Sequence, residues 1–128
     1  MAKHVLRQID LLKEKILSVG MLVEAAISGA VSAFSMGDAA AARRVVERDR
    51  QIDQLEIEVE EECLKILTLY QPAASDLRFV IAVLKINNDL ERTGDLAANI
   101  AKRVLFLVEN PAPSVEACLI GPPAIHKL

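Results

Sequence analysis

The sequence has 128 residues, of which 52% are hydrophobic, and carries a formal net charge of −3. Its hydrophobic residues are mainly Ala, Leu, Ile and Val, whereas aromatic residues make up 3% and tryptophan is absent. This balance favours an all-α protein with one aliphatic core. The negative net charge argues against a broad nucleic-acid-binding surface, and we interpret the four arginines between positions 43 and 50 as a solvated helix face.

The compartment is expected to be the cytoplasm. Residues 1–7 lack the apolar segment of a signal peptide. No uncharged apolar stretch reaches the roughly 18 residues that a membrane-spanning helix needs. Cys63 and Cys118 have neither metal-ligand nor C-x-x-C spacing. We therefore expect reduced thiols and no spanning helix.

The first helix is predicted over residues 3–36. Apolar residues recur there at alternating steps of three and four, which is the pattern of a long bundle helix. Further apolar residues flank this stripe, so the helix is expected to face two neighbours. Gly20 and Gly29 weaken a helix by about 1 kcal/mol each relative to Ala, and we attribute them to close packing. The predicted inward residues are Ile9, Leu12, Ile16, Val19, Val23, Ala26, Ala30 and Ala33.

The second helix is predicted from residue 39 to 70 or 71. Gly37 suits the left-handed position after a helix, and Asp38 is a favourable N-cap for the next one. Carboxylates lie in its inward stripe, where burying them without partners would cost several kcal/mol. The inward residues are Val45, Asp49, Ile52, Glu56, Val59, Cys63, Ile66 and Tyr70, and Asp53 borders them.

The third helix is predicted from about Ser75, its expected N-cap, to Glu109. Pro72 breaks the chain before it, and short turns make consecutive helices antiparallel neighbours. The architecture is therefore an up-down-up three-helix bundle over residues 1–109, followed by a Pro-rich tail over 110–128 that is a linker, a docking peptide or disordered. The predicted inward strip holds Leu77, Val80, Leu84, Asn87 or Asn88, Glu91, Asp95, Ala98, Ala101 or Lys102, and Leu105.

Two acidic pairs are the most informative feature of the sequence. Asp49 and Asp53 form a D-x-x-x-D pair, and Glu91 and Asp95 form an E-x-x-x-D pair. A spacing of four places both members of a pair on one helix face. Position 72 lies midway between the two pairs, so a hairpin folded there brings all four carboxylates to the same level.

Three interpretations of this acidic patch remain open at this point. It is a metal site of oxygen ligands suited to Fe, Mn or Mg; or its acids pair internally with nearby arginines; or the strip lies exposed in a groove. The arginines within helical reach are Arg48, Arg50, Arg92 and Arg103, and the further candidate ligands are Glu56, Glu60, Asn88 and Asp89.

No catalytic motif accompanies the patch. A ferritin-like di-iron centre would need Glu-x-x-His on its helices, and neither His4 nor His126 supplies it. The sequence has no Gly-rich phosphate loop, nucleophile elbow or Ser/His/Asp set. Cys63 is interpreted as a core residue. We therefore expect a protein that is not an enzyme, and a metal-dependent phosphohydrolase is the weakest of the functional hypotheses.

Three stretches carry a resemblance to a known family. Residues 47–56 (ERDRQIDQLE), 71–78 (QPAASDLR) and 88–100 (NDLERTGDLAANI) resemble the PhoU family, regulators that accompany the phosphate-specific ABC transporter of bacteria. The resemblance spans about residues 1–109. It implies a three-helix bundle whose E(D)-x-x-x-D motifs, here Asp49/Asp53 and Glu91/Asp95, bind a metal cluster, with iron as the expected metal and other divalent metals as alternatives.

The resemblance also implies a function. The expected role is to restrain phosphate uptake and the phosphate-starvation response through contacts with the transporter ATPase and a sensor histidine kinase. Full-length family members carry two tandem bundles, whereas this chain has one, so it is a fragment, a truncated gene product or a half-length form that dimerises to rebuild the pair. A homodimer is expected from the amount of aliphatic surface on the bundle and the polar strip along one groove. Association with the membrane would then be peripheral, through the transporter. The alternative is a structural helical oligomerisation module whose acids are ion-paired and bind no metal.

Overall fold

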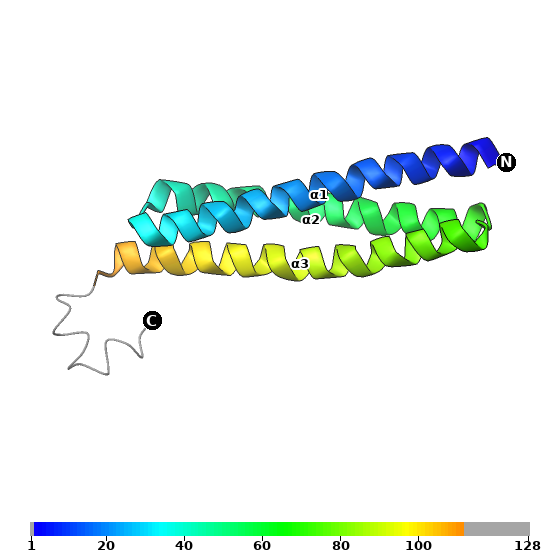
Figure 1. The fold of residues 1–128 in the computed structure, drawn as a ribbon. Coiled ribbons are helices and arrows are strands. Elements are labelled where there is room, and N and C mark those ends of the chain that lie inside the picture. The colour runs from blue at the N-terminus through cyan, green and yellow to red at the C-terminus, as the bar shows by residue number, and fades with distance from the viewer. Residues whose placement is uncertain (1, 112–128) are drawn as a thin grey trace.

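The structure is a computed structural model that describes residues 2–111, and it contains three long helices. They are α1 (Ala2–Met36), α2 (Ala39–Leu69) and α3 (Ala74–Glu109). The helices lie side by side and alternate in direction, and each packs against the other two (Figure 1). The predicted all-α, up-down-up bundle is confirmed. Beyond Pro111 the predicted tail, with Cys118 and His126, lies outside the described residues.

The turn between α1 and α2 follows the sequence prediction. Gly37 adopts the left-handed conformation with φ of 64°. The side chain of Asp38 then accepts a hydrogen bond from the backbone N–H of Ala41 at 3.1 Å and caps α2. These two residues reverse the chain within one short turn, which makes α1 and α2 antiparallel neighbours.

The predicted N-cap of α3 was wrong. Ala73, not Ser75, occupies the N-cap position, with an extended backbone and no side-chain capping bond. Its carbonyl accepts the first helical hydrogen bond, from the N–H of Leu77 at 2.8 Å. The backbone already turns at Gln71, with φ of 42°, so the helix begins earlier and Ser75 lies inside its first turn.

The core stripes predicted for α1 and α2 are confirmed, apart from a few half-buried members. Leu12 and Val19 on α1 pack with Val59 and Ile66 on α2, and all four are fully buried. Cys63 is also a core residue. Gly29 packs closely, because a Cβ there would lie 3.1 Å from Val45 Cγ2. Close packing does not explain Gly20, because a Cβ there would have nothing within 4 Å.

The inward strip predicted for α3 was partly wrong. Leu77, Glu91 and Asp95 are exposed, and smaller residues occupy the buried positions of α3. The helix is thus rotated relative to the predicted strip, so that its acids lie at the border of the core, facing α2. This rotation avoids the cost of burying unpaired carboxylates. The buried residues of α3 are Val80, Val83, Asn87, Gly94, Ala97, Ala98, Ala101 and Val104.

Helix α1 is more apolar than α2 and α3. Its segment His4–Met36 is long and apolar enough to cross a membrane by length and composition, although 28% of its most apolar stretch is buried inside the bundle. A core helix of a bundle passes the same test. The sequence prediction of no spanning segment therefore depends on Glu24, which interrupts the apolar run.

Candidate metal centre

The antiparallel hairpin of α2 and α3 brings the two acidic pairs to the same level. Carboxylate oxygens of Asp49 and Asp53 on α2 and of Asp95 on α3 all lie within 4.8 Å of one another. Asp49 is half-buried, and the other two are exposed. The register expected from the midpoint at Pro72 is therefore present for three of the four predicted residues.

The fourth predicted residue lies in the adjoining hollow. Glu91 lines a hollow of about 340 Å³ between α2 and α3, which we call the acidic hollow. Five of its six lining residues are carboxylates, so the negative charge is continuous from the aspartate cluster into the hollow. Its lining residues are Asp53, Glu56, Ile57, Glu60, Glu91 and Asp95.

Glu56 is the most informative residue of the hollow. Its side chain is 4% exposed, and neither carboxylate oxygen has a hydrogen-bond partner among the described residues. Asn87 of α3 donates from Nδ2 to the backbone carbonyl of Glu56 at 3.0 Å, leaving its own Oδ1 unpartnered. Buried polar atoms normally have partners, so the three unpartnered oxygens beside the acidic cluster fit a site for a positively charged group.

Burial and charge repulsion perturb the acids of this region. Burial raises the pKa of Asp49 above its ordinary value, and the charges of Asp53 and Asp95 raise it further. Lys102 acts in the opposite direction. The raised pKa of Asp49 therefore reflects a carboxylate that is harder to ionise, first because it is partly buried and second because like charges lie beside it.

The effect is larger at Glu56. Burial raises the pKa of Glu56 to about 7, and the next largest cause is the charge of Glu91, followed by Asp53 and Asp95. In the metal-free chain this group is therefore partly protonated near neutral pH. A cation placed among these acids would reverse that effect by favouring the ionised forms.

Internal ion pairing does not account for the cluster in residues 2–111. The salt bridge found there joins Arg92 to Asp89 at 2.6 Å, and both side chains are largely exposed. No described ion pair involves the aspartate cluster or Glu56. The arginines predicted within reach thus leave the clustered negative charge uncompensated by direct contacts.

The donor set fits a metal ion. Carboxylate oxygens are the ligands of hard and borderline divalent cations such as Mg²⁺, Mn²⁺ and Fe²⁺. Three such oxygens already lie close together, and Glu56 adds a buried carboxylate without a partner. The sequence named Glu56 only as an additional candidate, because its place in the hydrophobic stripe of α2 gave no information about its partners. Its burial and orphaned oxygens distinguish it from Glu60.

The other candidates from the sequence lie apart from this region. His4 is exposed near the start of α1. Cys63 is buried, and its burial raises the pKa of the thiol to about 11, so a reactive thiolate is disfavoured. Asp89 pairs with Arg92 instead of lining the hollow.

Fold and site together define a class: long three-helix bundles that present paired carboxylates from two adjacent helices. A family model described as "PhoU domain" matches residues 16–104. The chain therefore belongs to the PhoU family. The crystal structure of PhoU from Pseudomonas aeruginosa is similar, with a TM-score of 0.78 and 41% identity, covering 90% of this chain and 56% of that one.

Named relatives agree with this family. The chain is 39% identical over 105 residues to the phosphate-specific transport system accessory protein PhoU homolog of Aquifex aeolicus, covering 82% of this chain and 48% of the relative. It is 42% identical over 117 residues to the Pseudomonas putida homolog, covering 89% and 46%. The chain thus spans about half the length of the curated relatives that it matches.

Proposed function

We propose that this chain is a non-enzymatic regulator of phosphate uptake and of the phosphate-starvation response, acting in the cytoplasm through protein contacts. The support is the family match together with relatives named as accessory proteins of the phosphate-specific transport system. The proposed partners are the transporter ATPase and the sensor histidine kinase that the resemblance implies. The proposed homodimer remains a separate prediction.

We further propose that the acidic hollow and the aspartate cluster beside it hold metal ions. Asp49, Asp53, Glu91 and Asp95 are the proposed ligands, with iron as the expected metal. The metal would supply positive charge that holds α2 and α3 together at this level. The observation that carries this proposal is Glu56, which is buried beside the cluster with both oxygens unpartnered.

Elemental analysis tests the metal proposal. Protein purified without an affinity metal column should carry iron or another divalent metal, and Asp49→Ala/Asp53→Ala should lose it. Glu58→Ala/Glu61→Ala is the control, because it also removes two carboxylates from the same helix and both residues lie outside the hollow. Metal absent from the parent protein, or retained in the first variant, would exclude these ligands.

A reporter of the phosphate-starvation response tests the regulatory proposal. In cells that lack their own regulator, the chain should lower reporter expression under phosphate-rich conditions. Asp49→Ala/Asp53→Ala should weaken that effect, whereas the control pair should not. A folded, metal-bound chain without any effect on the reporter would contradict regulation while leaving the metal site intact.

The alternative function, a helical oligomerisation module with structural acids, makes the opposite prediction. Its bundle should purify without metal and keep its stability in a chelator. The lack of direct ion pairs to the aspartate cluster within residues 2–111 gives this alternative no support from contacts. Elemental analysis therefore separates the two functions directly.

A further inference from the structure

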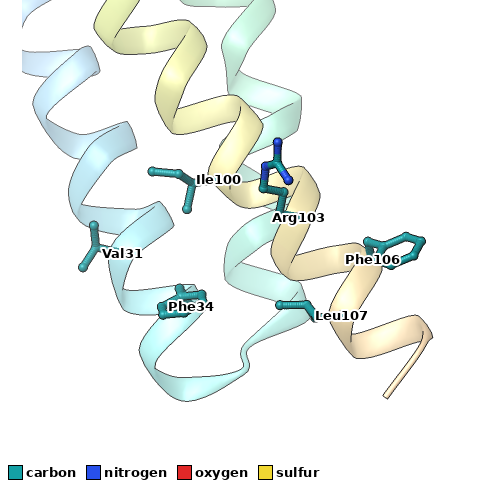
Figure 2. A pocket seen from close by; sticks show the side chains of 6 residues that line it. All are labelled: Val31, Phe34, Ile100, Arg103, Phe106 and Leu107. Carbon is teal, nitrogen blue, oxygen red and sulfur yellow. The ribbon is translucent and has the colours of Figure 1, made fainter. Parts of the chain in front are cut away.

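An apolar groove opens at the end of the bundle where α3 ends. It has a volume of about 380 Å³ and lies between α1 and α3, and α1 ends at the same end of the bundle (Figure 1). Val31 and Phe34 border it on α1, and Ile100 and Leu107 extend toward α1 from α3 (Figure 2). Phe34 is 63% exposed although it is a large aromatic side chain. Residues 2–111 therefore leave apolar side chains of this groove in water.

Arg103 adds one positive charge to the groove. It is the charged residue of the lining, and no ion pair of Arg103 is found within the described part of the chain. The groove thus presents apolar side chains together with a guanidinium group. An occupant that fits it combines apolar side chains with a carboxylate.

The segment that follows α3 in the sequence has this composition. Residues 114–120 (SVEACLI) contain Val115, Cys118 and Leu119 at spacings of three and four, which a helix would place on one face. Glu116 supplies a carboxylate beside them. The segment contains no basic residue that would repel the guanidinium group of the groove.

The same segment starts within reach of the groove. Helix α3 ends at Glu109, two residues after Leu107 of the lining. Ile100 lies 11 residues before Pro111, or about 17 Å along the helix. An extended chain covers about 3.3 Å per residue, so residues 111–119 span about 26 Å. A tether this short gives an effective concentration on the order of 1 mM at the groove, so the burial of a few apolar side chains is enough to hold the segment there.

We propose that residues 114–120 dock into this groove, with their apolar side chains against Phe34 and Ile100. Glu116 then lies beside Arg103. The prolines between α3 and the segment stop the helix and allow the chain to turn back over it. The docked segment covers the groove and excludes other proteins from it, so it regulates access to this end of the bundle. This inference goes beyond the proposed function and depends on neither a metal nor a second copy.

The thiol of Cys118 provides a probe of docking in the full chain. Iodoacetamide alkylates exposed thiols, and peptide mass spectrometry distinguishes Cys118 from the buried Cys63. Cys118 should be alkylated at least about 10-fold more slowly in the parent protein than in Phe34→Asn, because burying two apolar side chains favours the docked form by at least that factor. Phe34 is exposed in the bundle, so circular dichroism should show unchanged helicity in this variant.

Leu64→Asn is the matched control, since Leu64 is an exposed leucine on α2 outside the groove. It should keep the slow alkylation of the parent protein. Arg103→Gln should speed alkylation about 2- to 5-fold, because an exposed ion pair contributes little. An unchanged rate in Arg103→Gln would contradict the placement of Glu116.

Protein concentration separates docking within one chain from docking between chains. The alkylation rate should be the same from about 1 µM to about 100 µM, because a tethered segment has a fixed effective concentration. Slow alkylation that appears only at the higher concentration would assign the groove to another copy and overturn the proposal. Equal rates in the parent protein and Phe34→Asn, or fast alkylation in the control, would also overturn it.

Discussion

The two sides of α3 border surfaces of different chemistry. Toward α2, α3 borders the acidic hollow, where Glu56 is buried without a partner and like charges surround it. Toward α1, it borders an apolar groove that Val31 and Phe34 line from α1, and Phe34 is exposed to water there. The first side carries uncompensated charge, and the second carries uncovered apolar area. Each is unfavourable for an isolated bundle.

The two surfaces would therefore be stabilised by different kinds of binding partner. A cation would relieve the repulsion in the hollow, whereas a protein surface would relieve the apolar exposure. The hydrophobic core lies between these two surfaces, and Leu12 and Val19 are fully buried in it. The bundle therefore provides a stable frame on which each surface can be altered separately.

The largest effect on the free energy of unfolding should come from a substitution in the hydrophobic core. Leu12 is fully buried, so Leu12→Ala should lower the free energy of unfolding by about 2–5 kcal/mol through lost burial and a cavity. Met21→Ala, an exposed site on the same helix, should change it by less than about 0.5 kcal/mol. Urea unfolding measures both, and equal losses would contradict the assigned core.

The acidic hollow should make stability depend on pH in the metal-free protein. Because the folded pKa of Glu56 is raised from 4.5 to about 7, its contribution is fully present below the unfolded pKa and is lost as pH rises toward 7. The slope is at most about 1.4 kcal/mol per pH unit for one proton. Glu56→Gln should flatten this part of the profile.

Urea unfolding in a chelator, from about pH 5 to about pH 8, gives that profile. Glu58→Gln removes a charge from the same helix outside the hollow and serves as the control, which should keep the parent slope. A parent protein whose stability did not fall between these pH values would contradict the burial assigned to Glu56.

A smaller effect should separate the two glycines of α1. Gly20→Ala should stabilise the protein by up to about 1 kcal/mol, because helix propensity improves and nothing lies within 4 Å of the added Cβ. Gly29→Ala should gain less, since its Cβ would lie 3.1 Å from Val45 Cγ2. Thermal unfolding compares them, and a larger gain at Gly29 would contradict this packing.

The sequence predicted the helices well because local signals agreed with the tertiary structure. Gly37 and Asp38 carry a turn and a cap that depend on neighbouring residues only. Ser75 failed as a cap because Ala73 can begin the helix once the backbone has turned at Gln71. N-cap propensity favours serine over alanine, so the observed start of α3 at Ala73 depends on where the chain reverses and not on local propensity.

The candidate site was predictable in position but not in detail. The spacing of two acidic pairs about Pro72 gave their common level, which the proximity of Asp49, Asp53 and Asp95 supports. The rotation of α3, which moves Glu91 and Asp95 to the border of the core, accompanies the inward packing of small residues such as Gly94. Glu56 is buried against α3, where Asn87 donates to its backbone carbonyl, and periodicity in one helix does not reveal a contact with another.

Anomalous diffraction from crystals of the full chain, grown without chelator, would test the metal site most directly. We predict an anomalous peak between α2 and α3, about 2.0–2.6 Å from carboxylate oxygens, with ligands from the proposed set of Asp49, Asp53, Glu91 and Asp95. Glu56→Gln crystals should show whether the buried carboxylate contributes to it. Well-ordered carboxylate side chains in metal-supplemented crystals, with no anomalous peak among them, would contradict the proposed metal site.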